Sequence, residues 1–134
     1  MNCVRIAGRV FSGIGEGRIY VELYRSEIEK VLGIKPYPGT LNVKLEHEYV
    51  DIVKRLLVPN PHAVIKPPKE GLAPVLAWRA YVKDLVVYIV KPVKTVWRFD
   101  VIELVAEKNL RELFGLADGD TIEVLVPLAQ DLKC

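Results

Sequence analysis

The stretch GTLNVKL, residues 39–45, alternates apolar and polar side chains with a period of two. In a β-strand, successive side chains point to opposite faces of the sheet. Leu41, Val43 and Leu45 would therefore face a core, while Thr40 and Asn42 would lie side by side on the polar face. Two neutral oxygen ligands suit Mg²⁺, which binds few protein ligands and keeps water or phosphate oxygens. Taken alone, the stretch is explained more simply as an amphipathic strand with a solvated polar face.

Further short apolar runs along the chain predict a protein built mainly from β-strands. We expect strands over residues 2–11, 18–23, 39–45, 76–82, 85–90 and 99–106, and a final one within DGDTIEVLV, residues 118–126. Many short strands with few helices are typical of a barrel.

Three short helical segments separate these strands. Ser26 and Glu29 form a capping box for the first helix, which Gly33 ends. The second covers residues 48–57, and the third is NLRELFG, capped by Asn109. Residues 58–71 are rich in proline and turn residues, which predicts a surface loop.

The segment FSGIGEGRIYVEL, residues 11–23, places glycines at positions 13, 15 and 17 between two β-like runs. It lacks the Gly-Lys-Ser/Thr ending of a P-loop and the glycine spacing of a dinucleotide site. Because a strand is expected to follow, phosphate binding at a helix N-terminus is excluded here. A glycine-rich hairpin can still present backbone N–H groups to phosphate, and Arg18 adds positive charge.

Composition restricts the class of protein. The 134 residues are 51% hydrophobic and 27% charged, as in one globular domain, and the net charge of +2 is too small to indicate nucleic-acid binding. No apolar run approaches the roughly 20 residues of a membrane helix, and no signal peptide begins the chain, so we expect a cytoplasmic protein.

Cys3 and Cys134 lack metal-ligand spacing. In the cytoplasm we expect two free thiols, although a bridge between the termini remains an alternative.

Glu103 is a carboxylate inside the apolar run FDVIELVAE, residues 99–107. Burial would raise its pKa and make it a candidate catalytic base, whereas a glutamate on an edge strand would face water. The basic run KPVKT, residues 91–95, is expected to be a solvated connection. His47 and His62 have no spacing for a metal site or a catalytic triad, and we expect both at the surface.

Together, several motifs resemble the archaeal CTP-dependent riboflavin kinase family. They are GIGEGRIY, LGIKPYPGTLNVKL, VKTVWRFDVIELVAEKNLRELFGLADGD and the final strand, and residues 48–74 contribute nothing to the match. The resemblance implies a mainly β fold for residues 1–134 as a single domain, a six-stranded cradle-loop (RIFT-type) β-barrel with short helices. It also implies an enzyme that uses CTP to phosphorylate the ribityl 5′-hydroxyl of riboflavin, giving FMN and CDP.

The resemblance also assigns site residues. Thr40 and Asn42 would hold Mg²⁺, and Thr95 and Glu103 would bind the flavin, with Glu103 able to orient or deprotonate the ribityl hydroxyl. The residues expected to bind the nucleotide are Ile14, Gly15, Glu16, Gly17, Arg18, Ile19, Lys108, Asn109, Leu110 and Arg111.

A second hypothesis belongs to another class of protein. Small barrels with a Gly-Asp turn, such as that at residues 118–120, also serve as DNA-binding or assembly modules. The small net charge and the GTLN stretch favour the enzyme. Because the first expected strand begins close to Met1, we expect none of the additional DNA-binding domain that some family members carry. We therefore expect riboflavin and CTP as partners, no nucleic acid or membrane, and a monomer.

Overall fold

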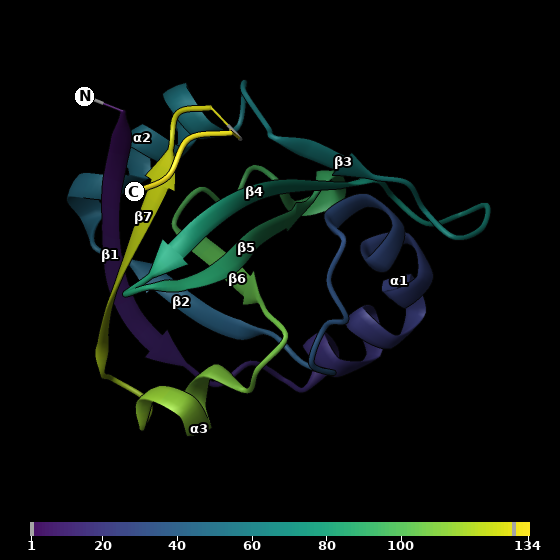
Figure 1. Cartoon of the computed structure of the whole chain (residues 1–134), viewed down its shortest axis with the longest axis horizontal. Helices are drawn as coiled ribbons and strands as arrows, with labels where there is room; N and C mark the ends of the chain where they lie inside the picture. Colours follow the sequence, from purple (N-terminus) through teal and green to yellow (C-terminus); the bar gives the residue numbers. More distant parts are fainter. Residues whose placement is uncertain (1, 130) are drawn as a thin grey trace.

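The computed structural model describes residues 2–129 and 131–134 and is a closed antiparallel barrel with one long helix on its outside (Figure 1). The strands are β1 Cys3–Phe11, β2 Leu41–Leu45, β3 Ala63–Ile65, β4 Val75–Val82, β5 Leu85–Pro92, β6 Val101–Val105 and β7 Thr121–Pro127. The helices are α1 Glu16–Leu32, α2 Val50–Ile52 and α3 Leu110–Phe114, with 3₁₀ turns at His47–Tyr49 and Val93–Thr95 and a π turn at Val53–Leu57. None of the described helices is long and apolar enough to span a bilayer.

Six of the strands form the barrel, which confirms the six-stranded barrel that the family resemblance implied. Their order is β4-β5-β6-β2-β1-β7, and the pairing of Tyr81 in β4 with Leu125 in β7 closes the ring. The three-residue β3 lies outside the ring and pairs with the first half of β4. It belongs to the segment that we expected to be only a surface loop. Its strand geometry depends on the neighbouring β4, which the local composition does not reveal.

The barrel interior contains the inward-facing residues of all six strands. Leu41, Val43 and Leu45 of β2 are buried there, which confirms the alternation read from the sequence. Trp78 of β4 is fully buried, and its indole N–H donates to the carbonyl of Leu57 at 2.9 Å. The helical segment over residues 47–57 therefore covers one end of the interior, as its Val53 and Leu57 are buried in the same core.

Helix α1 corrects the sequence prediction for residues 18–23. We expected a strand there, but a continuous 17-residue helix runs from Glu16 to Leu32 and is followed by the left-handed residue Gly33. Its buried residues are Val21, Tyr24 and Ile28, which recur every three or four residues as on one helix face. Ser26 lies inside the helix rather than at its start, and Gly33 ends it as predicted.

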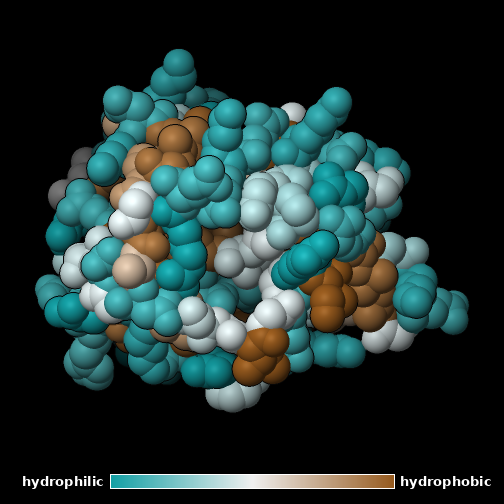
Figure 2. All heavy atoms as spheres, turned by 90° about the horizontal axis from the view of Figure 1, so that it is seen from below, coloured by the Kyte–Doolittle hydropathy of each residue, from teal (hydrophilic) through white to brown (hydrophobic). Residues whose placement is uncertain are grey.

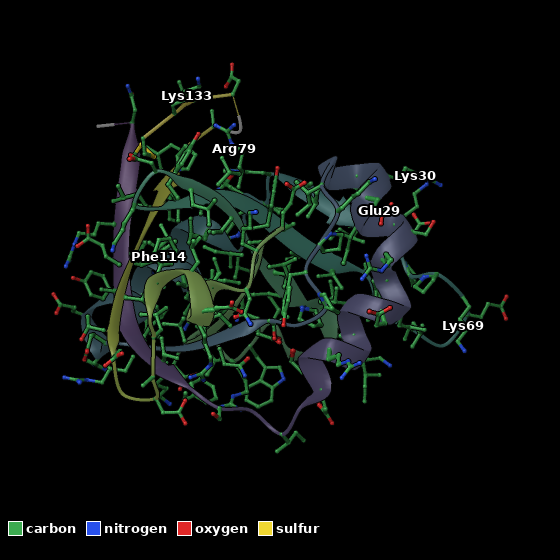
Figure 3. The ribbon with its side chains drawn as sticks, turned by 60° about the horizontal axis from the view of Figure 1, so that its bottom comes forward. Glu29, Lys30, Lys69, Arg79, Phe114 and Lys133 are labelled. Carbon is green, nitrogen blue, oxygen red and sulfur yellow. A yellow bond between two sulfur atoms is a disulfide. The ribbon has the colours of Figure 1, made fainter. Side chains whose placement is uncertain are left out.

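A second apolar layer lies between α1 and the outer face of the barrel. Ile65, Val75, Val90 and Val105 pack there against the buried face of α1. The Tyr24 hydroxyl donates to the carbonyl of Ala73 at 2.6 Å, which anchors the helix to the segment before β4. The opposite side of α1 faces outward, and Figure 3 shows Glu29 and Lys30 on it. The start of α1 lies beside the start of β2, where Gly17 packs against Thr40.

The two cysteines contradict the expectation of free thiols. Cys3 and Cys134 form a disulfide across a sequence separation of 131 residues, with their Cα atoms 6.1 Å apart. The pairing of β1 with β7 brings the two ends of the chain together, and Figure 1 shows them side by side. A bond between positions so far apart in sequence constrains the unfolded chain strongly.

Candidate active site

The glycine segment packs directly on the polar face of β2. A Cβ atom added to Gly13 would lie 2.6 Å from the amide nitrogen of Asn42, and one added to Gly17 would lie 2.2 Å from the hydroxyl oxygen of Thr40. At both distances the Asn42 or Thr40 side chain would have to move away to make room for the added atom. Two of the three alternate glycines therefore leave space for the two side chains that the sequence indicated as metal ligands.

Thr40 connects this contact to the predicted catalytic carboxylate. Its hydroxyl donates a hydrogen bond of 3.0 Å to Glu103. Asn42 is the direct cross-strand partner of Glu103 in the pairing of β2 with β6, so the three side chains form one polar group. Burial raises the pKa of Glu103, while the Thr40 hydrogen bond and the positive charge of Lys91 lower it. The carboxylate is thus partly buried among apolar neighbours, one of the two alternatives that the sequence allowed.

The beginning of α1 lies at this group and corrects the expected hairpin. Gly15 takes a left-handed conformation with φ of 86°, and the helix starts at the next residue without a side-chain cap. The first backbone N–H groups of a helix have no partner within the helix, and the helix dipole adds partial positive charge there. A helix N-terminus suited to phosphate, which the sequence analysis excluded, is therefore present.

Two cavities meet at the polar group. One of about 200 Å³ is lined by Thr40, Gly39, Tyr37 and the four residues expected to complete the nucleotide site, Lys108, Asn109, Leu110 and Arg111. The other, of about 260 Å³, is lined by Glu16, Gly17, Thr95 and Glu103, together with Tyr20 and Lys91. Thr40 borders the first cavity and Glu103 the second, so their hydrogen bond marks the boundary between the two.

A narrow apolar slot of about 30 Å³ extends beneath α1 from the same point. It is lined by the stacked rings of Tyr20 and Tyr24, whose centroids are 5.1 Å apart, and by Thr40 and Glu103. The slot, the two cavities and the start of α1 surround one small group of polar side chains. Figure 1 places the first turn of α1 and helix α3 at the same end of the barrel. Viewed from below in Figure 2, this end is mostly hydrophilic, with separate hydrophobic patches.

Helix α3 forms one wall of the nucleotide cavity, but most of its polar side chains are already hydrogen-bonded within the protein. Asn109 caps the helix through a bond from the Glu112 N–H at 3.2 Å, as the sequence predicted, and also donates to the Tyr37 hydroxyl at 3.1 Å. Arg111 donates to Asp118 at 2.6 Å. Of the four predicted residues of this segment, Lys108 is exposed and has no hydrogen bond among the described residues.

Four predicted nucleotide-binding residues line neither cavity nor the slot: Ile14, Gly15, Arg18 and Ile19. Ile14 and Ile19 are 86% and 67% exposed, and Arg18 is also exposed without a hydrogen bond among the described residues. Their placement follows from the helix, since α1 directs Val21 and not Ile19 toward the barrel. They lie at the outer edge of the site, within the glycine segment and the first turn of α1.

Three cavity-lining residues were not expected from the sequence: Tyr37, Tyr20 and Lys91. Lys91 was expected in a solvated connection, but it is only 5% exposed, while Thr95 of the same run is exposed as a loop residue. Tyr37 stands in the motif PYPGTLN, immediately before β2, and this position was the one available signal. The burial of Lys91 had no local signal, since it depends on the turn that follows it.

The donors present fit a magnesium ion better than a softer metal. Within residues 2–129 and 131–134, no three His, Cys, Asp or Glu side chains gather into a metal-binding group. The glycine contacts instead direct the Thr40 hydroxyl and the Asn42 amide toward the start of α1, where phosphate oxygens could supply the remaining ligands. A protein usually supplies only a few oxygen ligands to Mg²⁺, and phosphate oxygens and water fill the remaining coordination positions.

The amino-acid sequence of this chain is similar to those of known proteins. A sequence model labelled CTP-dep_RFKase, with the description "Domain of unknown function DUF120", matches residues 10–126. The riboflavin kinase of Staphylothermus marinus is 36% identical over 123 residues, which is 92% of each chain. That of Aeropyrum pernix is 39% identical over 129 residues, covering 91% of this chain and 95% of its own.

A longer relative shares the same domain. The riboflavin kinase of Pyrobaculum islandicum is 45% identical over 130 residues, which is 93% of this chain but only 61% of that protein. The matched region includes the glycine segment, β2, β6 and α3, which together form the polar group and both cavities. The chain therefore belongs to the archaeal CTP-dependent riboflavin kinase family.

Proposed function

We propose that this protein transfers the γ-phosphoryl group of CTP to the ribityl 5′-hydroxyl of riboflavin, producing FMN and CDP. The observation that carries the proposal is the position of Thr40, whose hydroxyl donates to Glu103 and packs against Gly17 in the first turn of α1. One side chain thus links a phosphate-binding helix start to a carboxylate that could serve an acceptor hydroxyl. The relatives named riboflavin kinase support the acceptor, and the family name supports CTP as the donor.

The nucleotide would occupy the cavity of about 200 Å³ between β2 and α3. Its phosphates would then extend past Thr40 to the start of α1, where backbone N–H groups lack partners. The absence of side chains at Gly13 and Gly17 allows that backbone to lie directly against Asn42 and Thr40, which would bring the metal ligands and the helix start to the same phosphates. Exposed Lys108 would add positive charge at the mouth of the cavity.

Riboflavin would occupy the second cavity, of about 260 Å³, with its ribityl end at Glu103. Tyr20 borders both this cavity and the apolar slot, and its ring offers a flat surface suited to an aromatic ligand. Thr95 borders the same cavity from the turn after β5, in agreement with the flavin-binding role implied by the resemblance. The two substrates would meet at the Thr40–Glu103 pair.

Thr40 and Asn42 are the residues that would hold Mg²⁺. When bound there, the ion would neutralise charge on the donor phosphates, which is its usual role in phosphoryl transfer. Both side chains are fixed by β2 and by their glycine contacts, so they lose little freedom on binding. Such fixed positions are the main protein contribution to this class of reaction.

The transfer itself requires little covalent chemistry from the protein. The ribityl oxygen forms a bond to the γ-phosphorus, and the bond from that phosphorus to the β-bridging oxygen breaks, leaving CDP. The proton of the hydroxyl passes to the carboxylate of Glu103, which Thr40 orients through its hydrogen bond. The free N–H groups at the start of α1 stabilise the charge on the phosphoryl oxygens.

A nucleotide panel with riboflavin tests the proposed function. We expect FMN to form with CTP and Mg²⁺ in equal amount to CDP, and at least about tenfold faster than with ATP, GTP or UTP. Product is measured by mass spectrometry, and binding by the thermal shift that each compound causes. Stabilisation by duplex DNA, with no FMN formed and no shift caused by CTP or riboflavin, would favour the binding-module hypothesis instead.

Substitution of Gly17 by alanine tests the contact between α1 and Thr40. The new Cβ would meet the Thr40 hydroxyl and turn it away from Glu103, so turnover should fall at least about tenfold. The melting temperature should change little, since alanine favours a helix and the threonine side chain can rotate. Ser26→Ala, at an exposed position of the same helix, is the matched control and should behave as the wild type. Unchanged turnover in Gly17→Ala would show that the contact does not position the site.

Glu103→Gln tests the carboxylate while keeping an acceptor for Thr40. We expect turnover to fall by about 10² or more, the range of a lost general base, while the dissociation constant of CTP changes by less than about threefold. Glu70→Gln, an exposed residue between β3 and β4, is the control. If turnover and CTP affinity fell in parallel, Glu103 would be a nucleotide-binding residue and not a base.

A further inference from the structure

Lys91 is the one buried charged side chain in the described part of the chain. It is the last buried residue of β5 and borders the proposed flavin cavity beside Glu103 and Thr95. Burial of an ammonium group in an apolar environment is costly unless the group is hydrogen-bonded and faces opposite charge. Two hydrogen bonds and the nearby carboxylates of Glu103 and Asp100 offset that cost for Lys91.

The ammonium group of Lys91 bonds to the turn that carries Thr95. Its nitrogen donates to the carbonyl of Arg98 at 2.8 Å and to the carbonyl of Val101 at 2.6 Å. The N–H of Arg98 in turn donates to the carbonyl of Thr95 at 3.0 Å. A chain of two hydrogen bonds thus runs from Lys91 to Thr95, and the bond to Val101 fixes the same turn to the start of β6.

Nearby carboxylates favour the charged ammonium form of Lys91, but they do not fully offset the effect of burial. Burial lowers the pKa of Lys91 most, Glu103 on β6 and Asp100 in the turn raise it, and the positive charge of Arg98 lowers it further. The net result is a pKa of about 8, below the usual 10.5. From α1, Glu16 borders the same cavity and adds a further negative group. Of these carboxylates, Glu103 exerts the largest effect on Lys91.

We propose that Lys91 is a positioning residue of the flavin half of the site, which holds the Thr95 turn against β6 and places positive charge beside Glu103. This inference rests on the proposed function and extends it to a residue outside the assigned ligands. A neutral donor could form one of the two carbonyl bonds, but it would bring no charge to Glu103. Lys91 therefore has two separable roles. In the anchoring role its hydrogen bonds hold the turn, and in the electrostatic role its charge acts on Glu103. Different substitutions of Lys91 remove one or the other.

The electrostatic part predicts a pH dependence. Below pH 8 Lys91 carries its proton and faces Glu103 as a cation, and above pH 8 it is neutral. The value of kcat/KM for riboflavin at saturating CTP and Mg²⁺ should therefore fall as the pH rises through about 8. Lys91→Arg keeps the charge at every pH of the assay and should remove that fall. Lys94→Met, an exposed lysine three residues along, is the control and should retain it.

The anchoring part is tested with Lys91→Met and Lys91→Gln. Lys91→Met should lower kcat/KM for riboflavin at least about tenfold, since it removes the charged donor that holds the carbonyls of Arg98 and Val101 in the turn. The dissociation constant of CTP should stay within about twofold of the wild type, because Lys91 does not border the nucleotide cavity. Lys91→Gln should recover part of the loss without restoring the pH dependence.

The outcomes distinguish this inference from the proposed function. If the wild type forms no FMN with any nucleotide, the proposed function fails and this inference with it. If the wild type forms FMN but Lys91→Met matches it in kcat/KM for riboflavin, only the role of Lys91 is wrong. Should Lys91→Met fail to fold, the pH profiles decide: an equal fall above pH 8 in the wild type and Lys91→Arg overturns the role.

Discussion

The close approach of the glycine segment to β2 is the constraint on which the site depends. Gly13 and Gly17 have no space for a Cβ atom, because Asn42 and Thr40 occupy it. This contact brings the start of α1 to the polar face of β2, and the pairing of β2 with β6 adds Glu103. The barrel provides a rigid sheet, and α1, packed on its outer face, provides the helix start. The site thus lies where the start of α1 meets β2. The buried residues of these two elements belong to different apolar layers of the protein.

Features determined by local sequence were predictable. The alternation in residues 39–45 correctly placed Leu41, Val43 and Leu45 in the core and the polar residues outside, because a strand has a strict period of two. The Asn109 cap and the left-handed Gly115 define α3 through contacts within a few residues. The importance of Thr40, Asn42 and Glu103 as a group came from the resemblance, and the structure brings them into contact.

Features that depend on distant parts of the chain were not predictable in the same way. Residues 18–23 alternate like a strand, but α1 forms because Val21, Tyr24 and Ile28 together match the apolar outer face of the barrel. Lys91 reads as a surface residue until the turn after it supplies two carbonyls. The bond between Cys3 and Cys134 arises because β1 and β7 pair along their length. In each case tertiary structure overrides a local preference.

The central claim is that the glycine contacts hold Thr40 and Asn42 ready for a magnesium ion on the donor phosphates. The most direct measurement is the dissociation constant of CTP by calorimetry with and without Mg²⁺, for the wild type, Asn42→Ala and the control Asn60→Ala, an exposed asparagine outside both cavities. We expect Mg²⁺ to lower the dissociation constant of CTP about tenfold or more for the wild type and Asn60→Ala, but much less for Asn42→Ala. Equal tightening in all three proteins would contradict it.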